Sequence, residues 1–209
     1  RYRLPAEMVR DNALAMSDLL VRTVGGSSIK PSQPTGYYRH LNFPRRVYAP
    51  DQDQRQYRRG VYVHWQRQFL HPMLKALDAP SREECTAQRP RSNTPLEALV
   101  MLNDPSMVDA AISFAAQLLN TDHANQSEKL EHAFEMAVSR RPDGFEMAAL
   151  KQLLAAELAH YQSQPEAAEQ LLDTADSTID LKSLSPQELA AWTGITRALM
   201  NLQETVTRY

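Results

Sequence analysis

The chain has 209 residues, of which 43% are hydrophobic and 23% charged, and its formal net charge is -2. These values are typical of an ordinary folded domain, and they exclude a disordered, collagen-like or coiled-coil protein. No apolar run approaches the roughly 18 residues of a membrane helix, and the near-neutral balance argues against a nucleic acid partner. We therefore expect a single α-helical domain over residues 1–209, with no membrane insertion.

The charges are divided unevenly along the chain. Residues 1–91 hold 16 Lys and Arg against 8 Asp and Glu, whereas residues 92–209 hold 7 against 17. Because opposite charges attract, we expect the two parts to attract each other within the domain.

The N-terminal part predicts two helices joined by a long loop. Residues 4–24 place apolar side chains at helical spacing after Pro5, and the Gly25-Gly26 pair predicts the end of this helix. Residues 27–53 are rich in proline and tyrosine, which predicts an irregular but ordered loop packed on its aromatic rings.

Residues 55–69 carry Tyr57, Val61, Trp65 and Phe69 at four-residue steps, which favours a helix that Pro72 ends. Alternation of apolar residues at 61–63 leaves a strand possible. Residues 77–91 predict irregular structure.

The C-terminal part predicts a series of helices with clear starts. Thr94 and Glu97 have the spacing of a capping box, with proline at the first helical position. Further starts are predicted at Asp104, Asp143, Pro165 and Ser185, the last as a second capping box, and its helix is expected to run to about Val206. With a helix over residues 130–138, the chain is expected to be all-α, with six or seven helices. The irregular N-terminal loop would pack on the C-terminal bundle.

The chain offers few residues with the spacing of a metal or catalytic motif. The histidines are His40, His64, His71, His123, His132 and His160. None has the spacing that binds zinc or attaches haem c, so we expect no metal site and no cofactor in this chain. His64 and His71 could share a helix face as ligands, but we favour two half-exposed side chains. The single cysteine, Cys85, excludes an internal disulfide, and we expect it to be a small buried apolar residue rather than an activated thiol.

Residues 85–95 concentrate cations at the expected start of a helix, where the helix dipole attracts anions. Arginine and aromatic side chains suit carboxylate or carbohydrate recognition, although they are equally typical of interfaces. The candidate binding residues are Arg89, Arg91, Asn93, Tyr37 and Trp65. The alternative, which we favour, is that the arginines bind carboxylates or helix ends in the acidic part of the chain.

Several segments resemble one family along nearly the whole chain. The matching segments are residues 77–85 and 91–105, then 4–12, 25–36, 57–59, Trp65, 141–142 and 199–208. They resemble the signature of the planctomycete cytochrome-associated C-terminal domain of unknown function. Leu77 and Glu97 replace the phenylalanine and glutamine more usual in the family. Because its members carry about one or two further helices upstream, the resemblance implies that Arg1 falls inside the domain.

The resemblance implies a setting rather than a reaction. Such domains stand at the C-terminal end of large exported proteins that often carry a c-type cytochrome module. The resemblance therefore implies a periplasmic or secreted location and haem c in another domain. The family has no established catalytic residues, so whether the chain is an enzyme stays open. We expect a non-catalytic accessory domain that contacts other domains of the same polypeptide or other subunits. The alternative is an enzymatic or substrate-binding domain for an anionic or carbohydrate-like ligand, coupled to that haem.

Overall fold

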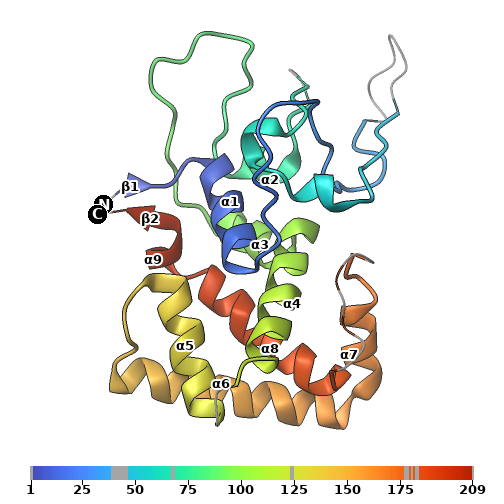
Figure 1. Cartoon of the computed structure of the whole chain (residues 1–209). Coiled ribbons are helices and arrows are strands. Elements are labelled where there is room, and N and C mark those ends of the chain that lie inside the picture. Colours follow the sequence, from blue (N-terminus) through green and yellow to red (C-terminus); the bar gives the residue numbers. More distant parts are fainter. Residues whose placement is uncertain are drawn as a thin grey trace.

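A computed structural model of the chain describes residues 2–38, 47–66, 69–122, 125–176, 179, 181 and 184–208. Within these residues the fold is all-α, 56% helical and almost without strands, as predicted (Figure 1). The α-helices are α1 (Ala6–Met16), α2 (Pro72–Ala76), α3 (Pro95–Asn103), α4 (Pro105–Leu119), α5 (Gln126–Val138), α6 (Gly144–Ser163), α7 (Pro165–Leu172), α8 (Pro186–Met200) and α9 (Gln203–Val206). Phe43, His40 and His123 lie outside the described residues.

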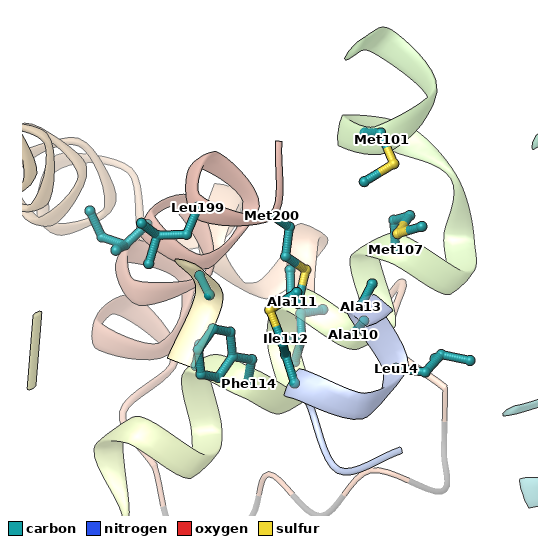
Figure 2. Close-up of a cluster of buried hydrophobic side chains, with 14 of the residues drawn as sticks. Ala13, Leu14, Met101, Met107, Ala110, Ala111, Ile112, Phe114, Leu199 and Met200 are labelled. Carbon is teal, nitrogen blue, oxygen red and sulfur yellow. The ribbon is translucent and has the colours of Figure 1, made fainter. Parts of the chain in front are cut away.

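The core forms where α8 packs against α4 and α6. Ala111 and Ile112 of α4 lie beside Met200 of α8, and all three side chains are buried (Figure 2). The small side chains of α4 allow the two helices to approach closely, so that backbone and side chains interdigitate. Close approach is visible at Thr196, whose hydroxyl donates to the carbonyl of Ala111 at 2.8 Å.

Local signals placed most helix starts correctly. The Thr94 amide donates to the Glu97 carboxylate at 3.3 Å within a capping box, and Asp104 accepts from the Ser106 amide at 3.0 Å. Asp143 forms a second capping box with Glu146, with bonds of 2.8 and 2.9 Å. The box predicted at Ser185 is wrong, because the Ser185 hydroxyl donates to the Gln187 side chain at 3.1 Å and no side chain among the described residues caps α8.

Replacing Asp143 by alanine is expected to lower the free energy of unfolding by about 0.5–2 kcal/mol, because the capping carboxylate is lost. Ser185→Ala is the matched control at the start of α8, and it is expected to stay within about 0.5 kcal/mol of the parent. Urea unfolding of both variants checks this difference. An equal loss for the two variants would contradict the cap assignment.

The first helix is shorter than its apolar pattern predicts. It ends at Met16, and Asp18 follows with φ 55, so the chain turns back well before Gly25. The following residues instead wrap around the guanidinium of Arg58, which donates to the carbonyls of Thr23 at 3.1 Å and Ser27 at 2.7 Å and also to that of Gly25. A buried arginine thus sets the course of this segment.

The helix predicted over residues 55–69 is wrong. The chain forms two short 3-10 turns, η1 (Gln54–Tyr57) and η2 (Gly60–Tyr62), and isolated parallel bridges join Val21 to Arg58 and Ile29 to Val63. The proline at 72 begins α2 rather than ending a helix. Tertiary contacts override the four-residue pattern, since the Gly60 amide donates to Asp11 of α1 at 2.6 Å.

Gly60 is expected to tolerate no side chain. A Cβ at this position would lie 2.9 Å from the Cα and the carbonyl oxygen of Glu7, which are backbone atoms of α1 and cannot give way. Gly60→Ala should therefore destabilise the protein by about 1–3 kcal/mol through overpacking. Gly194→Ala on α8 is the control, because its Cβ meets mainly the flexible end of Glu157 and alanine favours the helix. Thermal melting that lowers Tm equally in both variants would contradict this reading.

The C-terminal end differs from the single long helix predicted there. Helix α8 ends at Met200, α9 follows, and β2 (Thr207–Arg208) pairs antiparallel with β1 (Tyr2–Arg3). Both ends of the described chain therefore lie side by side, at the left of Figure 1.

Candidate functional site

The predicted cations Arg89 and Arg91 do line one cleft. The cleft lies between the start of α1 and residues 79–92, which we call the arginine loop, the long green loop at the top of Figure 1. Its volume is about 210 Å³, and it is also lined by Arg3, Leu4 and Leu77. We call this space the arginine cleft.

A network of hydrogen bonds closes the base of the arginine loop. Asp78 accepts from the backbone amide of Ser92 at 2.6 Å, from its hydroxyl at 2.8 Å and from Arg3 at 2.7 Å. Arg3 also forms an ion pair with Glu97 of α3. Although burial alone would raise it, the pKa of Asp78 is lowered by the bonds from Ser92 and Arg3. The network fixes both ends of the loop beside β1.

The two arginines of the loop are held differently. Arg89 donates to the carboxylate of Glu7 at 2.8 Å. This partner lies in the basic part of the chain, so the expected partner in the acidic part is wrong for Arg89. The Arg91 guanidinium lies over the ring of Tyr2 at 5.2 Å, and within the described residues it forms no ion pair. The cleft therefore presents one cation whose charge is not neutralised by a neighbour.

The structure does not bring the other three candidates into the arginine cleft. Asn93 lines a separate cleft of about 150 Å³ between α3 and α9. The Tyr37 hydroxyl donates to the carbonyl of Leu70 at 3.0 Å, and its ring packs edge-on against Phe69. Trp65 lies under the guanidinium of Arg82 at 3.9 Å. In these positions Tyr37 and Trp65 pack against neighbouring side chains and do not line the arginine cleft.

A buried polar cluster around Arg10 was missed by the sequence analysis. Arg10 is 1% exposed and donates to the carbonyls of Arg58 at 2.8 Å and Gln56 at 2.6 Å. Burial lowers its pKa, although the charge of Asp104 favours the ionised form. Burial in turn raises the pKa of Asp104 to about 6, against the opposing effect of the Arg10 charge.

Two further titratable groups belong to the same buried region. Burial raises the pKa of Asp109 to about 6, although the amide of Asp176 at 3.0 Å and the hydroxyl of Tyr57 at 3.1 Å both donate to its carboxylate. Burial lowers the pKa of His71 to about 4, so the ring is neutral and Nε2 donates to the carbonyl of Ser32 at 2.9 Å. Perturbed pKa values often mark functional sites, but these groups are all bound within the fold.

A signal for this cluster is present in the sequence. Arg10 interrupts the apolar stripe of the first helix, and Asp109 interrupts that of α4. A charged residue on a core-facing stripe must find partners elsewhere in the fold, because an unpaired buried charge is costly. Helical spacing together with charge is thus the signal that could have identified a buried polar centre at these positions.

Helix α6 has an unusual solvent-exposed side. It lies across the bottom of the view in Figure 1 and packs Leu150 and Leu154 inward, toward α8. Its opposite side is also mainly apolar, and Phe145 on it is 84% exposed. We call this side the outer face of α6. Its exposed residues, at helical spacing, are Phe145, Ala148, Ala149, Gln152, Ala155, Ala156, Ala159 and Ser163, and the exposed His160 and Gln162 border it near the end of the helix.

Other features give no indication of a reaction. Cys85 is exposed, so its predicted burial is wrong; the arginine loop carries it away from the core. Among the described residues, no group of three or more His, Cys, Asp or Glu side chains is placed to hold a metal ion. No described helix is long and apolar enough to cross a membrane.

Comparison with known proteins gives a family but no activity. No curated protein and no solved structure matches the chain. A family model matches residues 1–154, which include the arginine loop, the Arg10 cluster and about half of α6. The match covers well over half of the chain, which therefore belongs to the family described as PSD1, protein of unknown function (DUF1553).

Proposed function

We propose that this chain is a non-catalytic accessory domain that docks another domain or subunit through the outer face of α6. The observation that carries this proposal is the 84% exposure of Phe145 at one end of an apolar helix side. A helix that is apolar on opposite sides is normally covered on both, because exposed apolar area is costly in water. The outer face thus has the character of an interface that is uncovered in the isolated chain.

The buried titratable groups support a structural role rather than catalysis. Asp104 caps α4, and Asp109 accepts two hydrogen bonds that join three separate segments. His71 uses Nε2 to hold the carbonyl of Ser32. A general acid or base must reach a proton on the substrate, and these groups are directed into the fold.

The family resemblance supports a proposal for the larger protein to which the domain belongs. We infer that it belongs to a larger exported protein of the planctomycete type, located in the periplasm or secreted. Haem c would be bound by another domain, because attachment of haem c uses a Cys-x-x-Cys-His motif and this chain has one cysteine. The partner at the outer face would be that domain or a neighbouring subunit.

Cysteine labelling in the native host tests the interface. In a Cys85→Ser background, Ala149→Cys places a thiol on the outer face, and Glu166→Cys places a control thiol at an exposed position of α7. We expect the thiol at 149 to react several-fold more slowly in the native assembly than in the dilute isolated chain. The thiol at 166 should react equally fast in both.

Equal rates at position 149 in the two preparations would contradict the proposed interface. Protection that appears in the isolated chain on concentrating it would identify a second copy as the partner. Protection seen only in the native assembly would identify another domain or subunit.

A further inference from the structure

The arginine cleft has polar groups that the fold itself leaves without partners. Arg3 lines this cleft with a side chain that is 10% exposed; two of its nitrogens donate to Ser92, Leu77 and Asp78, and its buried Nε–H has no acceptor among the described residues. Arg91 forms no ion pair among the described residues. Helix α1 also starts at this cleft; among the described residues no side chain caps it, and the Met8 amide donates to the Pro5 carbonyl at 2.8 Å. Arg91 is therefore the arginine of this cleft that forms no ion pair among the described residues.

The charge of the lining is positive. Three arginines line it, and Asp78 is the one carboxylate among the described lining residues. Arg3 pairs with both Asp78 and Glu97, so the charge that is left over belongs to Arg91. Glu7, beside the cleft, neutralises Arg89 alone. An anion entering the cleft would therefore meet Arg91 near the positive end of the α1 dipole without displacing a carboxylate.

The size and the apolar walls of the cleft limit which ligands could fit in it. Its volume of about 210 Å³ lies below the 300–1,000 Å³ range typical of sites for small molecules and cofactors. Leu4, Leu77 and Pro90 add apolar surface. Such a space suits a single side chain with an aliphatic stem and a charged end, as glutamate has.

We propose that the arginine cleft binds a carboxylate side chain of an acidic peptide segment in a partner protein, with Arg91 as the principal contact. Tyr2 supports this role, because its exposed ring lies under the Arg91 guanidinium and keeps it beside the cleft. The site is independent of the outer face of α6, so either proposal can fail without the other.

A fluorescent peptide of alternating glutamate and alanine serves as the probe, and its glutamine counterpart serves as the uncharged control. Fluorescence anisotropy with the whole chain should show binding of the glutamate peptide only. Arg91→Gln should weaken that binding about tenfold, since one charge-assisted contact is lost. Arg22→Gln, at an exposed position outside the cleft, should change it less than twofold.

A second variant distinguishes recognition from a loss of folding. Glu7→Gln frees Arg89 from its ion pair and should tighten binding of the glutamate peptide, an effect that misfolding cannot produce. Equal binding of the two peptides, or equal weakening by the Arg91 and Arg22 variants, would overturn the proposal. Tighter binding by Glu7→Gln together with weaker binding by Arg91→Gln would establish it.

Discussion

Replacing Arg10 by methionine is expected to lower the free energy of unfolding by about 3–5 kcal/mol, the usual cost of removing one partner from a buried charged network. The substitution leaves the carbonyls of Gln56 and Arg58 without a donor, and it removes the positive charge that acts on Asp104. Chemical denaturation measures the loss. Because η1 and its flanking residues are fixed by these bonds, that segment should become the first to lose protection in hydrogen exchange.

Two companion variants test the reason for that loss. Arg22→Met removes an exposed arginine and should stay within about 0.5 kcal/mol of the parent. Arg10→Met combined with Asp104→Asn should cost less than the sum of the single variants, because the second change removes the charge that Arg10 compensates. Strict additivity would show that Arg10 acts only through its hydrogen bonds, against the charge coupling inferred here.

The stability contributed by His71 is expected to depend strongly on pH. Its pKa is lowered by burial to about 4 in the folded protein, whereas an unfolded histidine titrates near 6.5. As pH falls from 6.5 to 4, the unfolded chain binds a proton that the folded chain does not, so stability is lost. The loss amounts to about 3 kcal/mol relative to a His71→Gln variant, whose position does not titrate. Unfolding of both proteins across this range measures it.

Asp109 should show the opposite sign over nearly the same range. Its folded pKa of about 6 lies above the value of an unfolded aspartate, so the carboxyl contributes stability at low pH that is lost as pH rises through 6. Relative to Asp109→Asn, the parent should therefore gain stability on acidification while the His71 comparison shows a loss. If the difference in unfolding free energy between parent and variant changed with pH in the same direction for both residues, the burial that the structure assigns to one of them would be contradicted.

The C-terminal helices were largely predictable from local sequence. The starts at Asp104, Asp143 and Pro165 depend on side-chain caps and on the fixed backbone of proline, which act over three or four residues. The Ser185 start was predicted correctly although its capping box does not form. Local chemistry can therefore locate a helix start without determining which hydrogen bonds satisfy it.

The candidate sites were only partly predictable for the same reason. The concentration of cations in residues 85–95 indicated the arginine loop, and the structure does bring Arg89 and Arg91 to one cleft. Their placement relative to Asn93, Tyr37 and Trp65 depends on how distant segments pack, so composition alone grouped residues that the fold separates.

By itself, the sequence determined the all-α class, the buried face of most helices and most of the helix starts, because periodicity and caps act between neighbours along the chain. Only the tertiary structure decided the course of residues 17–30 and 54–63. There the controlling partners are distant: Arg10 bonds a carbonyl 48 residues away, Arg58 bonds one 31 residues away, and Gly60 needs the backbone of Glu7. A buried arginine satisfied by distant carbonyls overrides local preference, since leaving it unpaired costs more than the helical turns it displaces.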